Sequence, residues 1–197
     1  MMLQTTEILI VLLGYVLGCF STAYYLVKLR TGEDIRLMGS GNAGGRNAKT
    51  VLGTSGFVMV AFGDMAKGVI SVALALFFNL SPFATWLVVV AVVAGHIWPI
   101  QLRFRGGKGV ATALGAILVL NSTIIAIMVV LFGIIWFFLR HVTIGGLFVI
   151  AISPFITAFL GYSELDVIGN VLLAIIIIVA HRENIANLIT NSDGSRN

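Results

Sequence analysis

Long apolar runs occupy most of this 197-residue sequence, and few charges interrupt them. The first run, from Ile8 to Val27, contains no charged residue. Hydrophobic residues make up 59% of the chain and charged residues 10%, whereas soluble domains carry about 25% charged residues. Because only helices and closed barrels satisfy their backbone in lipid, and because runs of about 20 apolar residues span a bilayer as helices, the sequence predicts an all-α integral membrane protein. We expect one transmembrane domain over residues 1–197.

The runs predict seven transmembrane helices. Their expected bounds are Glu7–Lys28, Ser55–Phe78, Phe83–Gln101, Val110–Leu120, Ser122–Leu139, Ile144–Leu160 and Asp166–Ala180. The fourth is short because Asn121 and Ser122 interrupt a longer apolar run. That run is either one long tilted helix or two shorter helices, and we favour two.

Basic residues fall on one side of this topology. With seven spans, the segments 29–54, 102–109, 140–143 and 181–197 share a side and carry almost all Lys and Arg. The opposite side holds Glu7, Glu164 and Asp166 and no Lys or Arg. Because positively charged loops stay in the cytoplasm, we expect the N-terminus outside and the C-terminus in the cytoplasm. The net charge of +4 therefore reports orientation and not nucleic-acid binding.

Two of the basic segments are rich in glycine. Gly39–Asn47 reads GSGNAGGRN, and Arg103–Thr112 reads RFRGGKGVAT. Glycine lets backbone N–H groups converge on one point, and neighbouring cations reinforce an anion site there. We predict that both segments bind phosphate. The alternatives are a mobile linker for the first segment and an ordinary positive loop for the second.

Charged and titratable residues also occur within or beside the spans. Asp64 and Lys67 lie three residues apart on one helix face, where they form either a functional site or an ion pair that holds helices together. His96 lies at the end of the third span and is either a helix cap or part of the same pocket as the glycine-rich loop. His181 and Asn184 share a face where the last span closes, and His181 is a candidate acid, base or phosphate donor.

These segments, in this order, resemble the bacterial membrane glycerol-3-phosphate acyltransferases that use an acyl phosphate donor. The family pattern reads roughly GSGNxGxTNxxR, then GHxxPxxxxFxGGKGVAT, then HRxNIxRL, and the second is complete here from Gly95 to Thr112. The resemblance covers essentially the whole chain. It implies a multi-pass protein of the bacterial cytoplasmic membrane that transfers an acyl chain from acyl phosphate to the 1-hydroxyl of glycerol 3-phosphate, giving lysophosphatidic acid. The histidine–aspartate motif of the common glycerolipid acyltransferases is absent, as are a Walker loop and a Cys/His zinc cluster.

The resemblance also implies roles for individual residues. Ser40, Lys108, His181 and Asn184 would hold the glycerol phosphate or its reacting groups, with His96 close by and Asp64 and Lys67 in support. The residues that would cradle phosphate are Gly41, Asn42, Gly44, Arg46, Asn47, Gly106, Gly107 and Gly109. Acyl phosphate already has a good leaving group, so the protein needs chiefly to position two anions and stabilise developing charge. No metal, cofactor or protein base is required.

The first and third motifs depart from the family pattern. Arg46 stands where the family has Thr, and Thr50 stands where it has an Arg that contacts phosphate. Four residues on a helix share a face about 6 Å apart, so we predict that Arg46 replaces the missing cation, with Lys49 in reserve. Asn187 replaces a third-motif Arg, which weakens the positive field.

Two other classes of protein remain as alternatives. One is a small transporter of a phosphorylated solute, although transporters usually show internal repeats and a site at mid-membrane. The other is a catalytically weak relative that acts as a scaffold and contacts other lipid-synthesis enzymes, for which the departures at positions 46, 50 and 187 are the only support.

Overall fold

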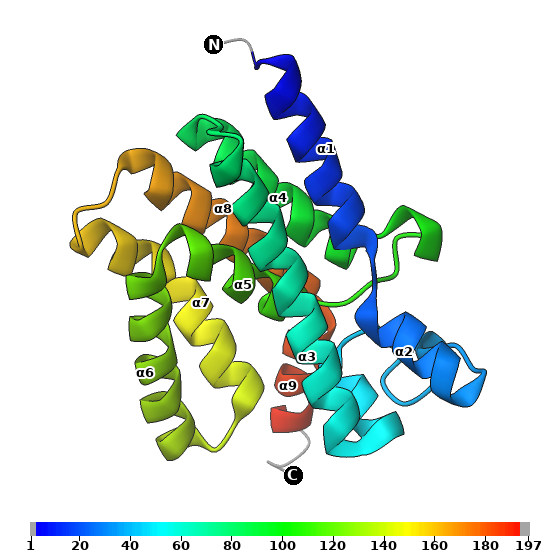
Figure 1. Ribbon diagram of the computed structural model, residues 1–197. Coiled ribbons are helices and arrows are strands. Elements are labelled where there is room, and N and C mark those ends of the chain that lie inside the picture. The colour runs from blue at the N-terminus through cyan, green and yellow to red at the C-terminus, as the bar shows by residue number, and fades with distance from the viewer. Residues whose placement is uncertain (1–2, 194–197) are drawn as a thin grey trace. The chain divides into compact units, whose positions relative to one another are not determined.

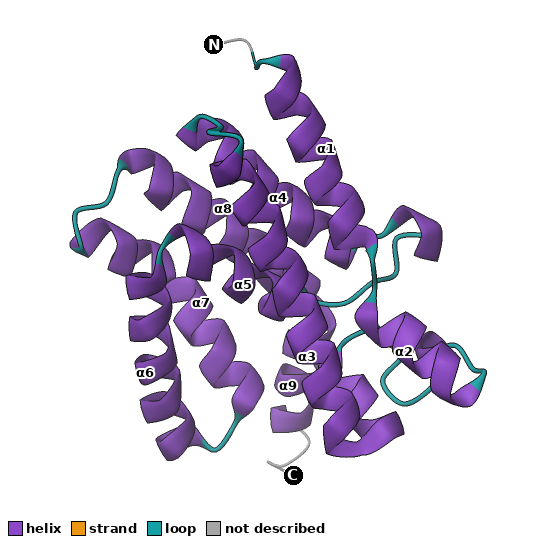
Figure 2. Cartoon of the chain, viewed as in Figure 1, coloured by secondary structure: helices purple, strands orange, loops and turns teal. Residues whose placement is uncertain are grey.

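The computed structural model describes residues 3–193, and every regular element among them is a helix (Figures 1 and 2). The α-helices and two short 3₁₀ helices are α1 (Thr5–Cys19), α2 (Thr22–Thr31), η1 (Ile35–Leu37), α3 (Gly45–Phe77), α4 (Pro82–Ile97), η2 (Ile100–Leu102), α5 (Val110–Leu120), α6 (Ser122–Leu139), α7 (Val142–Phe159), α8 (Glu164–Ala180) and α9 (Arg182–Asp193). The chain divides into two compact units, Met1–Ser122 and Thr123–Asn197.

Helices cover most of each expected span, and the all-α membrane fold is confirmed, whereas the number of seven membrane-crossing helices stays a prediction. Among the described residues, five helical segments are long and apolar enough to cross a membrane, or six if α8 and the start of α9, bent by 60°, form one span. The remaining apolar helix, α5, has 11 residues. It ends at Leu120 and α6 begins at Ser122, so the interruption at Asn121 does separate two helices. The expected orientation stays a prediction.

The first expected span, Glu7–Lys28, is not one continuous helix. It breaks after Cys19, and Ser21 caps the next helix by accepting a hydrogen bond from the Tyr24 N–H at 3.3 Å. The Lys67 side chain, from α3, donates to two carbonyls at the break, those of Gly18 and Phe20. The break was not predicted because Lys67, which donates to both carbonyls, lies far along the chain.

Glycines allow the helices of unit 1 to approach closely. A Cβ built on Gly18 of α1 would lie 3.1 Å from the Cα of Gly95 on α4, and one on Gly115 of α5 would lie 3.1 Å from the Cα of Met65 on α3. Contacts of this kind are typical of small residues between membrane helices, where dispersion forces replace the hydrophobic effect. The pairs α1–α4 and α3–α5 make the most extensive contacts in unit 1.

Helix α3 begins ten residues before the expected span, at Gly45, and kinks at Gly53. Gly53 has φ 74° and ψ −166°, a combination that only glycine adopts without strain. The kink turns the first part of the helix, Gly45–Leu52, into a separate segment that carries Arg46 and Asn47. The glycine-rich segment that we expected to be a loop therefore ends in a short helical arm.

Unit 2 contains a polar seam between α7 and α8. Asn170 donates to Thr157 Oγ1 at 3.2 Å. Pro154, inside α7, cannot donate to the carbonyl of Ile150, and the Ser153 hydroxyl donates to that carbonyl instead, at 2.9 Å. The proline is thereby accommodated within an apolar helix.

Replacing Gly53 by Ala should destabilise the protein, because it forces a Cβ into the glycine-only conformation. We expect a loss of about 1–3 kcal/mol, which lowers the midpoint of thermal unfolding in detergent by about 2–12 °C. Gly133→Ala is the matched control, since Gly133 lies in α6 with open space around its Cα, and it should be neutral or slightly stabilising. An unchanged midpoint for Gly53→Ala would show that the kink is not required.

Candidate functional site

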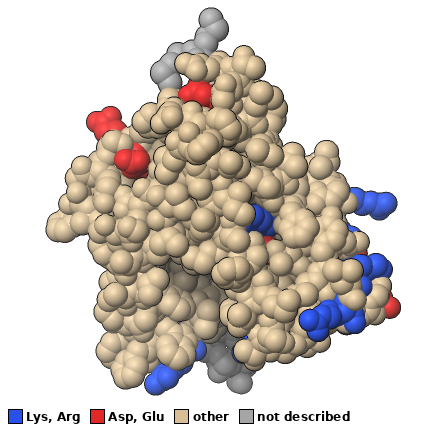
Figure 3. Space-filling model, viewed as in Figure 1, with Lys and Arg blue, Asp and Glu red and all other residues tan. Residues whose placement is uncertain are grey.

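The two glycine-rich segments lie together in unit 1. The Ala43 N–H of the first segment donates to the Gly106 carbonyl of the second at 3.3 Å. A second link is made by Arg36, whose Nη1 donates to the Leu102 carbonyl at 2.6 Å. Lys and Arg side chains gather on the part of unit 1 that carries α2 (Figure 3). The predicted phosphate loops are thus one structural feature, although they lie more than fifty residues apart in the sequence.

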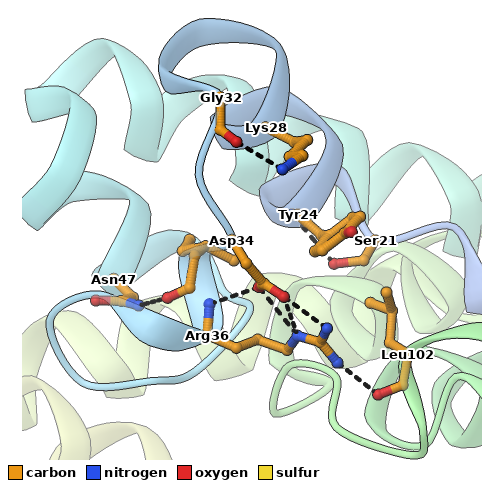
Figure 4. Close-up of polar contacts among 9 residues, drawn as sticks. Ser21, Tyr24, Lys28, Gly32, Asp34, Arg36, Asn47 and Leu102 are labelled. Atoms are coloured by element: carbon orange, nitrogen blue, oxygen red, sulfur yellow. Dashed lines mark hydrogen bonds and ion pairs between the residues drawn. The ribbon is translucent and has the colours of Figure 1, made fainter.

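Arg36 is held in place by Asp34 (Figure 4). Its Nη2 lies 2.6 Å from Asp34 Oδ2, and its Nε donates to both carboxylate oxygens. The hydrogen bonds from Arg36 lower the pKa of the Asp34 carboxyl, and those same bonds raise the pKa of Arg36. From the sequence, Arg36 was only a topological charge. Asp34, two residues earlier, was the one signal in the sequence that Arg36 would be held in place to link the two segments.

Asn47 organises the first glycine-rich segment from its centre. Its Nδ2 lies 3.0 Å from the Ile35 carbonyl, 2.9 Å from that of Met38 and 3.0 Å from that of Asn42. Its Oδ1 accepts from the Ser40 N–H at 3.0 Å. The side chain is 2% exposed. Its contacts are therefore with loop backbone, and they place Ser40 at the loop surface.

The other predicted residues of this segment lie at or near the surface. Ser40 and Arg46 are exposed, and Gly41, Asn42 and Gly44 are half-buried. Gly41 has φ 70°, a left-handed conformation that favours glycine. Arg46 lies in the first turn of α3, and its carbonyl accepts from the Thr50 hydroxyl at 3.4 Å. Positions 46 and 50 are thus one turn apart on the helical arm, as the prediction for Arg46 requires.

The second segment folds back along the end of α4. The N–H groups of Gly106 and Gly107 donate to the carbonyls of Ile97 and His96 at 3.0 and 3.1 Å. A Cβ on Gly106 would overlap the carbonyl oxygen of His96, and a Cβ on Gly107 would overlap His96 Nε2. The preceding turn holds two non-glycine residues at positive φ, Arg103 at 55° and Phe104 at 60°. Such conformations are sparsely populated and cluster at functional sites.

This segment leads directly into the N-terminus of α5. Gly109 caps that helix with φ 83° and no side-chain hydrogen bond, and the half-buried Lys108 precedes it. A helix N-terminus has backbone donors and a partial positive charge that favour an anion. The fully buried Thr112, the third residue of α5, has a hydroxyl without a hydrogen-bond partner among the described residues. The arrangement suits a phosphate beside Lys108.

Asp64, Lys67 and His96 form a buried cluster beneath this segment. Lys67 Nζ lies 3.2 Å from Asp64 Oδ1 and 2.7 Å from His96 Nδ1. Asp64 Oδ1 also accepts from the Thr22 hydroxyl at 2.9 Å. The predicted pair is therefore a real ion pair, and it joins α1, α2, α3 and α4. Within residues 3–193, no group of three or more His, Cys, Asp or Glu could hold a metal ion.

His181 and Asn184 lie in unit 2, where α8 meets α9. His181 is buried, and its Nδ1 lies 2.8 Å from the Ile177 carbonyl. Because a carbonyl only accepts, Nδ1 carries a proton, and in the neutral ring Nε2 is the acceptor. Asn184 Oδ1 is buried and has no hydrogen-bond partner among the described residues. That these two residues act together with the loops of unit 1 stays a prediction.

Comparison with known proteins identifies the family. The sequence model for glycerol-3-phosphate acyltransferase matches residues 8–191. The chain belongs to this family. It is 42% identical over 190 residues to glycerol-3-phosphate acyltransferase 1 of Desulfitobacterium hafniense, covering 96% of this chain and 94% of that protein. It is 37% identical over 191 residues to the Clostridioides difficile glycerol-3-phosphate acyltransferase, covering 94% and 93%.

Solved structures agree with this assignment. The crystal structure of PlsY (YgiH), an integral membrane glycerol 3-phosphate acyltransferase, in its glycerol 3-phosphate form, matches with a TM-score of 0.88 at 30% identity, over 94% of this chain and 93% of that one. The lysophosphatidic acid form matches with a TM-score of 0.85 at 28% identity, over the same shares. The prediction of an acyltransferase is confirmed and is favoured over the transporter and the scaffold. The individual site residues remain predictions.

Removing the Asn47 side chain should collapse the first loop. Asn47→Ala leaves buried carbonyls without donors, so we expect a loss of about 2 kcal/mol or more in stability, seen as a fall of about 4–8 °C in the unfolding midpoint. Asn47→Asp should be at least as damaging, because it places a carboxylate oxygen against those carbonyls. Thr50→Ala, at an exposed site on the same arm, is the control and should change little. A stable Asn47→Asp variant would contradict this role.

Proposed function

We propose that the protein transfers an acyl chain from acyl phosphate to the 1-hydroxyl of glycerol 3-phosphate, producing lysophosphatidic acid and inorganic phosphate. The reaction would take place at the cytoplasmic face of a bacterial cell membrane, with the two units forming one acyltransferase domain. The observation that carries the proposal is the Ala43–Gly106 hydrogen bond, which brings two glycine-rich, cation-bearing segments together beside the N-terminus of α5. Relatives whose crystal structures are described as glycerol 3-phosphate and lysophosphatidic acid forms support the same substrate and product.

The glycerol 3-phosphate would bind through its phosphate to the joined loops. Lys108 supplies one cation and the backbone donors of α5 supply the helix-terminus contribution. Arg46 would supply the second cation from the helical arm, and the exposed Ser40 would bind the glycerol backbone or a phosphate oxygen. The buried Asn47 and the half-buried Arg36 hold these groups in place before substrate arrives, which reduces the entropy lost on binding.

The chemical step needs little from the protein beyond orientation. The oxygen of the 1-hydroxyl attacks the acyl carbon, and the bond from that carbon to the phosphate oxygen breaks. The electron pair leaves with the phosphate, and the hydroxyl proton passes to a phosphate oxygen of the substrate. In our proposal His181 Nε2 accepts a hydrogen bond from the 2-hydroxyl of the glycerol, which leaves the 1-hydroxyl proton directed at the phosphate oxygen. The Asn184 amide donates to the developing charge on the carbonyl oxygen.

The donor specificity provides the test. Purified protein in detergent, given glycerol 3-phosphate with palmitoyl phosphate, should release lysophosphatidic acid and one phosphate per turnover. Palmitoyl-CoA should give none, because thioester transfer would release CoA and not a phosphate that this site can hold. Folded protein that is active only with palmitoyl-CoA would contradict the proposal.

Lys108→Met and Lys108→Arg serve as a matched pair in the same assay. Loss of one charge-assisted hydrogen bond to phosphate costs about 1.5–3 kcal/mol, so Lys108→Met should raise the KM for glycerol 3-phosphate by about tenfold or more. Lys108→Arg keeps the charge and should retain more of the affinity. Equal KM values for wild type and Lys108→Met would remove Lys108 from the phosphate site.

A further inference from the structure

The ammonium group of Lys67 lies among acceptors only. Nζ donates to the carbonyls of Gly18 and Phe20 at 3.0 and 2.8 Å, and it contacts His96 Nδ1 at 2.7 Å. Asp64 Oδ1, at 3.2 Å, supplies the countercharge. A buried carboxylate needs a cation beside it, so Lys67 is charged and its three protons are directed at the two carbonyls and the imidazole.

This arrangement determines the tautomer of His96. An ammonium group has donors and no acceptor, so His96 Nδ1 must accept and the ring proton must be on Nε2. The competing arrangement, in which Nδ1 donates to Asp64, is disfavoured by distance, because Asp64 Oδ1 lies 3.6 Å from Nδ1. That separation is too long for a hydrogen bond of ordinary strength.

The Nε2 edge of His96 faces the junction of the two glycine-rich segments. A Cβ on Gly107 would overlap Nε2 and would lie 3.1 Å from the Ala43 carbonyl oxygen. Among the described residues, Nε2 has no hydrogen-bond partner. His96 is a buried residue, 5% exposed, but Nε2 is not among the fully buried side-chain atoms without a partner, which in that part of the chain are Thr112 Oγ1 and Asn184 Oδ1. A single N–H donor is therefore presented where the loops meet.

We propose that His96 donates its Nε2 proton to an anionic oxygen of a substrate bound at the two loops, and that Lys67 is the positioning residue that fixes this tautomer. His96 then binds as a donor and does not act as a base. This inference rests on the proposed acyl transfer for its ligand, but the tautomer can be measured without any activity.

The tautomer is tested by ¹⁵N NMR on detergent-solubilised protein with ring-labelled histidine. The chain has three histidines, and the signals of His96 are those lost in His96→Gln. We expect a neutral ring with the proton on Nε2 and a bare Nδ1. A ring protonated on Nδ1 alone would mean that Lys67 is the acceptor, and it would overturn the proposal whether or not the protein is an acyltransferase.

Two amide variants separate donation from a purely structural role. In His96→Gln the amide nitrogen can occupy the Nε2 position, which keeps the donor but loses the partner of Lys67. In His96→Asn the amide oxygen can occupy the Nδ1 position, which keeps that partner but loses the donor. We expect the KM of one substrate to be about tenfold or more higher in His96→Asn than in His96→Gln.

The KM values for glycerol 3-phosphate and for palmitoyl phosphate, measured separately, show whose oxygen accepts the proton. The reverse order, with His96→Asn tolerated and His96→Gln impaired, would show that His96 serves only as a partner for Lys67. Equal losses in the two variants would mean that the Nε2 proton makes no difference. Either result overturns the proposal.

Discussion

The ammonium group of Lys67 is the point at which the helices around the site are tied together. It reaches from α3 to the carbonyl end of α1 and to His96 on α4, with Asp64 as its countercharge. Helix ends inside a membrane must have their free carbonyls satisfied without water, and a cation at a helix C-terminus also complements the dipole. The break between α1 and α2 is therefore possible because Lys67 is there, and the same group sets the face that His96 presents to the glycine-rich loop.

A second constraint is the close approach of backbones, which glycine permits both between the helices and within the glycine-rich loop. In the helix pairs it lets α1 meet α4 and α5 meet α3. In the loop it lets Gly106 and Gly107 run along His96 and Ile97 and lets Ala43 bond to Gly106. The loop that binds phosphate in our proposal is thus not free to move as a linker would be. Its shape depends on α4, and α4 depends on the buried cluster beneath it.

Sequence patterns predicted the helices well where the apolar runs are long, because length and hydrophobicity alone determine a span. Val110–Leu120 and Ser122–Leu139 have the bounds that the interruption at Asn121 indicated. The break at Phe20 was missed because it depends on Lys67, which lies far along the chain. The helical arm Gly45–Leu52 was also missed, whereas the expected start of the second span at Ser55 lies just after the kink at Gly53. The candidate site was likewise predictable only in part. Glycine spacing and charge marked the loops, but the roles of Arg36 and Asn47 depend on partners brought together by folding.

In our proposal the two glycine-rich segments bind one phosphate. A double-mutant cycle with Arg46→Ala and Lys108→Met, in which glycerol 3-phosphate affinity is measured by calorimetry on detergent-solubilised protein, tests it directly. Cations that contact the same phosphate are coupled, so we expect an interaction free energy of about 0.5–3 kcal/mol between the two substitutions. Effects that add to within about 0.3 kcal/mol, or an Arg46→Ala variant with unchanged affinity, would contradict a shared phosphate site.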